Sequence, residues 1–132
     1  MLNVLVVEDE KLEREALILL LQENFSKQIH VLTAAYHGEQ ALLAFHQQKY
    51  QLVITDINIP RMNGLSLLRE IKKSDPDTRT IILTGYDYFK YAQESICIGV
   101  DDFILKPATQ KDLCERIRRV MELIEREQRG SH

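Results

Sequence analysis

The sequence predicts an α/β fold in which helices cover both faces of a parallel sheet. Short continuous apolar runs, rich in Val, Ile and Leu, alternate with longer segments of helical period along the chain. Continuous apolar runs are typical of strands that are buried on both faces. The alternation of the two patterns indicates repeated β-α units, and 132 residues suffice for one such domain but not for two.

Five apolar runs are the predicted strands. Each is continuous rather than alternating, which favours a strand with helices on either side. The predicted strands are Leu2–Val7, Val31–Ala35, Leu52–Thr55, Ile81–Leu83 and Phe103–Leu105.

Three of the intervening segments have a clear apolar stripe at helical spacing. These are Gly38–Phe45, Phe89–Gly99 and Leu113–Ile124, and we expect their stripes to cover the sheet. In the second segment the expected stripe includes Phe89 and Ile96, so both residues are predicted to lie in the core.

Two further segments complete the set of five helices. Leu65–Lys73 follows Gly64, which marks a tight entry, and Asp75-Pro76 stops it. Leu12–Glu23 is more uniformly apolar, so this helix is either deeply buried or shares its outer side with a partner. The sequence leaves both possibilities open.

Composition and charge exclude several classes of protein. A net charge of −3 gives no electrostatic reason to expect nucleic-acid binding. The longest apolar run, Ala16–Leu21, is too short to span a bilayer, and no signal peptide precedes it, so we expect a cytoplasmic protein. Cys97 and Cys114 lack zinc or redox spacing and are predicted to be buried. Residues 129–132 are typical of the remnant of an expression tag.

Polar residues that could bind a ligand or take part in a reaction follow four of the predicted strands. Glu8 and Asp9 come after the first strand, Asp56 after the third, Thr84 ends the fourth and Lys106 follows the fifth. The carboxyl ends of parallel strands emerge along one edge of the sheet, where ligands of open α/β folds bind. We therefore expect these side chains to converge.

Three carboxylates gathered in one cleft repel one another unless cations balance them. Lys106 supplies one positive charge, and the remaining excess suits a divalent cation. An all-oxygen ligand set favours Mg²⁺ or Mn²⁺ over zinc, and Mg²⁺ is the preferred assignment. Beside a metal, an ammonium and a hydroxyl, Asp56 is equipped to attack phosphorus and form an acyl phosphate.

A structural interpretation of the same residues is simpler. A single Asp after a strand is most often a turn residue or a helix cap, and a lone Lys-Pro pair is uninformative. The joint placement of Asp56 with Glu8, Asp9, Thr84 and Lys106 is much harder to attribute to turn chemistry.

Four segments carry a resemblance to a known family: LVVEDE (5–10), VITDINIPRMNG (53–64), IILTGYD (81–87) and GVDDFILKP (99–107). Over residues 1–128 the chain resembles the receiver domain of two-component response regulators. The resemblance implies a regulatory phosphoacceptor rather than an enzyme. It also implies a flavodoxin-like (βα)5 three-layer sandwich with strand order 2-1-3-4-5.

The resemblance assigns a role to each site residue. It implies that Asp56 accepts the phosphoryl group, that Lys106 and Thr84 contact it, and that the Lys106-Pro107 bond is cis. Asn58 and Tyr86 are expected to tune dephosphorylation. The implied Mg²⁺ ligands are Asp9, Asp56 and the backbone carbonyl of Asn58, with Glu8 contributing through a water because it is one methylene longer than the Asp of many relatives.

The resemblance also implies partners and a signalling mechanism. A sensor histidine kinase would donate the phosphoryl group, and Thr84 and Phe103 would switch the face formed by the fourth helix, fifth strand and fifth helix. This face is a possible homodimer interface. The aromatic stretch GYDYFKY (85–91) resembles receivers that precede an arabinose-regulator-type helix-turn-helix domain, so any DNA binding would belong to an output domain outside this chain. Its tyrosines either pack at the helix start or form a partner surface.

Three other functions compete with this interpretation. A haloacid-dehalogenase-type phosphatase carries a second acid two residues after its nucleophile, where this chain has Asn58, and no cap domain fits the length. A flavodoxin needs a Ser/Thr/Gly-rich phosphate loop, where this chain has the acidic EDEKLE (8–13). A stand-alone receiver that acts by protein contact remains an alternative.

Overall fold

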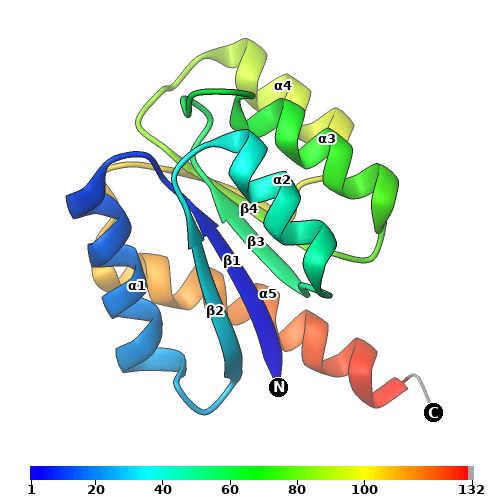
Figure 1. Ribbon diagram of the computed structural model, residues 1–132. Coiled ribbons are helices and arrows are strands. Elements are labelled where there is room, and N and C mark those ends of the chain that lie inside the picture. Colours follow the sequence, from blue (N-terminus) through cyan, green and yellow to red (C-terminus); the bar gives the residue numbers. More distant parts are fainter. Residues whose placement is uncertain (131–132) are drawn as a thin grey trace.

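Five parallel strands and five helices alternate strictly along the chain (Figure 1). The computed structural model describes residues 1–130, and the strands pair in the order β2-β1-β3-β4-β5, all parallel, which confirms the predicted flavodoxin-like fold. In chain order the elements are β1 (Leu2–Val7), α1 (Lys11–Phe25), β2 (Ile29–Ala35), α2 (Gly38–Gln47), β3 (Leu52–Thr55), α3 (Gly64–Ser74), β4 (Arg79–Thr84), α4 (Phe89–Ile98), β5 (Asp102–Leu105) and α5 (Gln110–Gly130).

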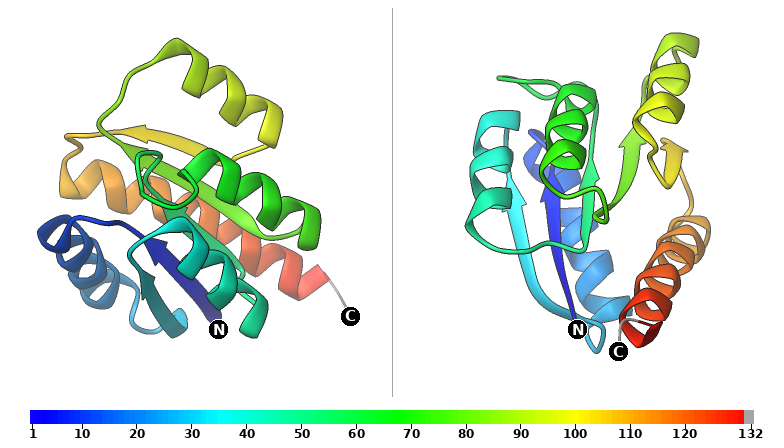
Figure 2. Two further views of the ribbon diagram at one scale, coloured as in Figure 1. Left: turned by 45° about the horizontal axis from the view of Figure 1, so that its top comes forward. Right: turned by 90° about the vertical axis from the view of Figure 1, so that its right-hand side faces the viewer.

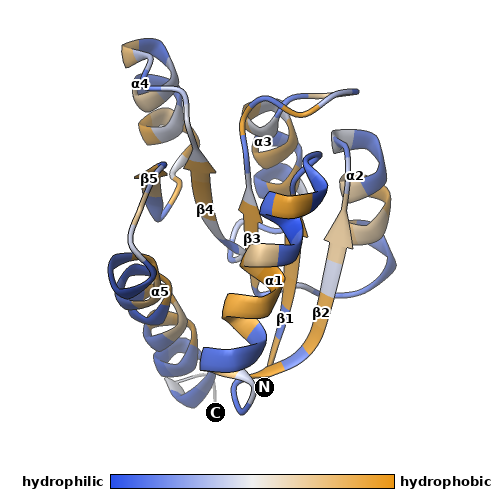
Figure 3. Ribbon diagram, turned by 90° about the vertical axis from the view of Figure 1, so that its left-hand side faces the viewer, coloured by the Kyte–Doolittle hydropathy of each residue, from blue (hydrophilic) through white to orange (hydrophobic). Residues whose placement is uncertain are grey.

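Helices lie on both faces of the sheet, as the continuous apolar strands predict (Figure 2). Strand residues alternate between two cores: Leu2, Val4 and Val6 of β1 pack with α1 and α5, whereas Leu5 and Val7 pack with residues of α2 and α3. Figure 3 shows the apolar strands between helices with hydrophilic outer faces. The start of β1 and the last turn of α5 lie toward the edge of the sheet opposite the carboxyl ends of the strands (Figure 1).

Helix α1 is amphipathic rather than deeply buried, which answers the question that its composition leaves open. Leu17, Leu21 and Phe25 are buried against the sheet, whereas Leu12 and Leu19 are exposed. Its outer side therefore combines these exposed leucines with charged residues such as Lys11 and Glu15. Within residues 1–130, no helix combines the length and apolar character needed to cross a membrane.

The predicted inner stripe of α4 is wrong. Phe89 and Ile96, expected in the core, are 75% and 78% exposed. The inner side instead contains Ser95, which is buried, with the half-buried Tyr91 and Ile98 four residues before and three after it. The inner side of α4 is centred on a polar residue, so a search for regularly spaced apolar residues does not identify it. The buried Ser95 hydroxyl donates a hydrogen bond to the Ala92 carbonyl at 2.7 Å.

Other expectations need smaller corrections. Cys114 is buried as predicted, but Cys97 is exposed on α4. β2 begins two residues before its predicted start, and as an edge strand it is mostly half-buried rather than covered on both faces. The predicted tag remnant 129–132 lies partly outside the described residues, and residues 129–130 continue α5.

Two glycines, Gly38 and Gly64, allow the backbone of the loop between β3 and α3 to pack closely against neighbouring backbone. A Cβ on Gly64 would lie 2.0 Å from the Asp56 carbonyl oxygen, and a Cβ on Gly38 would lie 2.1 Å from the Met62 carbonyl oxygen. The Gly38 amide donates to the Pro60 carbonyl at 3.0 Å, so the loop is bonded to the start of α2. These contacts support the unfavourable positive φ of Met62, 97°.

We expect Gly64→Ala to destabilise the protein by about 3 kcal/mol, because the new methyl group overlaps backbone atoms that cannot rotate away. Gly85→Ala is the matched control, since a Cβ there meets nothing within 4 Å and should change stability by no more than about 0.5 kcal/mol. Urea unfolding of both variants measures the difference. Equal stability of the two variants would contradict the close approach at Gly64.

Candidate functional site

The site lies where the strand order reverses, at the carboxyl ends of β1 and β3. These neighbouring strands pair in parallel from Val4 with Leu52 to Val7 with Thr55, so the residues that follow them emerge side by side. The Asp56 amide donates to the Val7 carbonyl at 3.1 Å, and the Glu8 amide donates to the Ala35 carbonyl at the same distance. Continued strand pairing thus fixes the backbones of both acidic residues.

Lys106 brings the acidic residues together from the other side of the sheet. Its amide donates to the Thr84 carbonyl at 2.8 Å, which continues the pairing of β4 with β5, and its peptide bond to Pro107 is cis, as expected. The ammonium then donates to Glu8 at 2.8 Å and to Asp56 at 3.2 Å. Glu8, Asp56 and Lys106, up to 98 residues apart in sequence, therefore meet in one cluster.

The Asp56 carboxylate is held at both oxygens. Oδ1 accepts hydrogen bonds from the amides of Ile57, at 2.6 Å, and Asn58, at 3.4 Å, while Oδ2 accepts from Lys106. Only 11% of the side chain is exposed. Its orientation is thus restricted, while one side faces an open cavity.

Burial and the lysine act in opposite directions on the buried acid Glu8. Burial disfavours its charged form and, despite the hydrogen bond from Lys106, raises the pKa of Glu8 to about 7. For Lys106 burial acts to lower the pKa, but the hydrogen bond that it donates to Glu8 and the charge of Asp56 outweigh this effect, so the pKa of Lys106 is raised. Lys106 therefore remains an ammonium while Glu8 exchanges its proton near neutrality.

A cavity of about 490 Å³ opens above these groups. Its lining includes every predicted metal-binding residue: Glu8, Asp9, Asp56 and Asn58, together with Tyr86 and Lys106. The candidate ligand atoms in this lining are oxygens with an excess of negative charge, which fits a hard divalent cation such as Mg²⁺. Carboxylate oxygens of Glu8, Glu13 and Asp56 lie within 4.8 Å of one another, whereas Asp9 is outside this trio, so its role as a metal ligand stays a prediction.

Neither of the two predicted switch residues, Thr84 and Phe103, lines the cavity. Thr84 is fully buried at the end of β4, and its hydroxyl accepts a hydrogen bond from the Tyr86 amide at 3.4 Å. Phe103 in β5 is half-buried against the core beneath α2, α3 and α4. Gly85 and Tyr86, rather than Thr84, line the cavity.

Two site residues on α1 escaped the sequence analysis. Glu13 in the first turn accepts a hydrogen bond from Lys106 at 3.2 Å. Arg14 donates to the Glu8 carbonyl at 3.0 Å and lies 4.2 Å from the centre of the Tyr36 ring, so it fixes the acidic loop. The acidic stretch 8–13 is the signal in the sequence that points toward Glu13.

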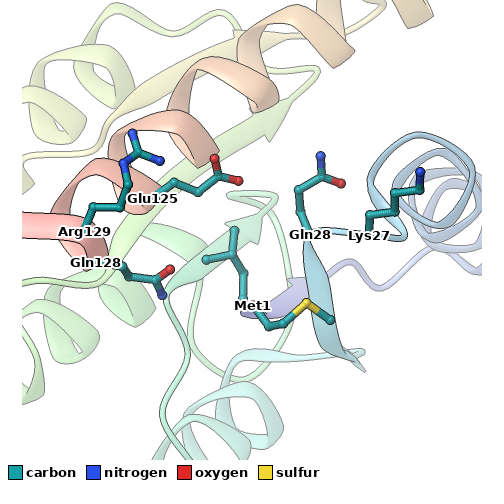
Figure 4. Close-up of a pocket in the computed structure, with 7 residues that line it drawn as sticks. Met1, Lys27, Gln28, Glu125, Gln128 and Arg129 are labelled. Carbon is teal, nitrogen blue, oxygen red and sulfur yellow. The ribbon is translucent and has the colours of Figure 1, made fainter.

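A second hollow, of about 310 Å³, lies at the opposite edge of the sheet (Figure 4). Met1, Lys27 and Gln28 face the end of α5 across it, where Glu125 and Arg129 project. Its lining contains none of the predicted site residues.

Comparison with known proteins places these features in a family. The profile of the response regulator receiver domain matches residues 4–118. An uncharacterised response regulatory protein of Staphylococcus epidermidis is 38% identical over 115 residues, which cover 86% of this chain and 44% of that protein. The transcriptional regulatory protein YkoG of Bacillus subtilis is 32% identical over 116 residues, which cover 88% of this chain and 49% of that protein.

Solved structures give the same result. The receiver domain of AraT, a response regulator from Geobacillus stearothermophilus, superposes with a TM-score of 0.86 at 35% identity, covering 96% of this chain and 98% of that one. The chain spans about half the length of the two curated relatives. Both are longer proteins in which the matching segment is one part.

We expect the stability of the protein without metal to fall relative to Glu8→Gln as pH rises from about 4.5 to about 7. Below this window both the folded and unfolded states hold the Glu8 proton. Within it the unfolded state, with a pKa of 4.5, releases the proton before the folded state does. The difference in unfolding free energy should change by about 3 kcal/mol across the window and then level off. Urea unfolding at a series of pH values measures it, and a pH-independent difference would contradict the raised pKa.

Proposed function

The chain belongs to the response regulator receiver domain family, and on this premise we propose that Asp56 accepts a phosphoryl group from a sensor histidine kinase. Receiver domains are regulatory phosphoacceptors rather than enzymes. The observation that carries the assignment to Asp56 is its position beside the cavity, with Lys106 3.2 Å from Oδ2. The cytoplasmic location predicted from the sequence remains part of this proposal.

In the proposed transfer, an Asp56 carboxylate oxygen attacks phosphorus and the bond from phosphorus to the histidine nitrogen of the donor breaks. The Lys106 ammonium neutralises charge on the phosphoryl oxygens. Asp9, Asp56 and the Asn58 backbone carbonyl would hold Mg²⁺, with Glu8 contributing through a water. The metal would add further neutralising charge.

The proposed signal is a change in the face formed by α4, β5 and α5. The phosphoryl group adds about −1.5 to −2 charge and three acceptor oxygens close to buried Thr84. We propose that Thr84 turns toward them and that half-buried Phe103 fills the space that it leaves. A change from 1:99 to 99:1 between two states needs about 5.5 kcal/mol of differential stabilisation. Phe103 lacks the hydroxyl of a tyrosine, so packing alone would set its rotamer.

The proposed output is control of transcription, because a relative of about twice the length is a transcriptional regulatory protein. The aromatic stretch 85–91 supports the arabinose-regulator-type subgroup, with DNA bound by an output domain outside this chain. Asn58 and Tyr86, both on the cavity lining, are proposed to tune loss of the phosphoryl group. The alternative is a stand-alone receiver that works by protein contact. The length of the full gene distinguishes between these two proposals.

Acetyl phosphate with Mg²⁺ should add the mass of one phosphoryl group to the protein, and Asp56→Asn should abolish the gain. Asp77→Asn, at the opposite end of the sheet, is the matched control and should be modified like the wild type. Borohydride reduction followed by peptide mapping should place the modification at Asp56. An unmodified wild type, or a label on another carboxylate, would refute the assignment.

Phosphorylation should promote dimerisation through the face of α4, β5 and α5, where Phe89, Ile96 and Leu105 are exposed. Ile96→Glu should weaken the self-association of the phosphorylated protein by about tenfold or more, because it places a charge in an apolar contact. Leu43→Glu on α2, also at an exposed apolar residue, should not. Sedimentation velocity with and without acetyl phosphate measures the effect. Identical sedimentation under both conditions would remove dimerisation from the proposal.

A further inference from the structure

The Lys106 ammonium is fully engaged by carboxylates. It has three N–H donors, and three carboxylates accept from it: Glu8 at 2.8 Å, Asp56 at 3.2 Å and Glu13 at 3.2 Å. A phosphoryl oxygen can therefore gain a hydrogen bond from Lys106 only if one of the present partners gives way.

The three carboxylates differ in the free energy that would be lost if each gave up its hydrogen bond with Lys106. The side chains of Glu8 and Asp56 are 6% and 11% exposed, so losing the ammonium would leave charge in a poorly hydrated site. The Glu13 side chain is 43% exposed on the outer helix α1, and water can replace the lysine there. Glu13 is the partner that Lys106 can leave most easily.

We propose that Glu13 competes with the phosphoryl group for Lys106, holding the ammonium in the unphosphorylated protein and releasing it on phosphorylation. The inference rests on the proposed function and deepens it. Glu13 is a positioning residue here, since it acts through Lys106 and does not touch the reacting atoms. It would set how readily the active state forms without affecting which residue is modified.

A metal-ligand role for Glu13 is the competing explanation. Its carboxylate lies within 4.8 Å of those of Glu8 and Asp56, so a cation could be shared by all three. The two roles predict opposite effects of removing the charge. Loss of a competitor strengthens binding of a phosphoryl analogue, whereas loss of a metal ligand weakens binding of Mg²⁺ and of the analogue with it.

Three variants separate these roles from a general effect of charge. Glu13→Gln removes the charge. Glu13→Asp keeps the charge but is one methylene too short for the contact with Lys106. Glu10→Gln removes one charge from the lining of the same cavity, at a side chain that makes no capping hydrogen bond. All three replacements are at exposed positions, so the fold should persist.

The experiment is an NMR titration of each variant with beryllofluoride, a phosphoryl analogue, at saturating Mg²⁺, after a titration with Mg²⁺ alone. We expect Glu13→Gln and Glu13→Asp to bind beryllofluoride about threefold more tightly than the wild type, the size typical of an exposed ion pair. The affinity of Glu10→Gln for beryllofluoride should differ from that of the wild type by less than this. The Lys106 ammonium signal of the protein without ligands should move in both Glu13 variants and not in Glu10→Gln.

Several outcomes would overturn the inference. Equal effects of Glu13→Gln and Glu10→Gln would indicate a general charge effect, and a Glu13→Asp protein that behaves like the wild type would exclude the direct contact. Weaker Mg²⁺ binding in Glu13→Gln than in Glu10→Gln would make Glu13 a metal ligand. A wild type that ignores beryllofluoride would refute the proposed function instead, while the ammonium signal would still report whether Glu13 holds Lys106.

Discussion

The contact between one ammonium and three carboxylates at the carboxyl edge of the sheet is the interaction on which the site depends. Without Lys106, the ionised carboxylates of Glu8, Glu13 and Asp56 would repel one another at distances below 4.8 Å. The lysine reduces but does not remove the excess negative charge. The remaining excess makes the cavity attractive to a divalent cation, while burial separately raises the pKa of Glu8 to about 7.

Backbone contacts make this charged cluster possible. Pairing of β1 with β2, of β3 with β1 and of β5 with β4 continues one residue past the strands, so the sheet itself positions the backbones of Glu8, Asp56 and Lys106. Gly64 lets the start of α3 approach the Asp56 carbonyl, and Gly38 lets α2 support the same loop. The backbone around Asp56 therefore also depends on two residues that carry no functional group.

The strands, their order along the chain and the edge that carries the site follow from the sequence, because buried parallel strands are continuously apolar and their carboxyl ends share one edge. Glu13 does not follow, because its contact with Lys106 depends on the direction in which α1 leaves the sheet. The inner side of α4 does not follow either, since it is centred on Ser95 and leaves Phe89 and Ile96 outside. Regular spacing of apolar residues identifies the inner side of a helix only where large apolar residues are buried on that side, and α4 buries none.

The weak anchoring of α4 has a consequence for the energetics of signalling. Ser95 is the one residue of α4 that is fully buried, whereas α3 buries Leu65, Leu67, Leu68 and Ile71. At about 25 cal/mol per Å² of apolar surface, sliding or tilting α4 sacrifices far less free energy than moving α3 would. A displacement of α4 would thus alter the outer surface of the protein while the residues buried beneath α3 keep their packing.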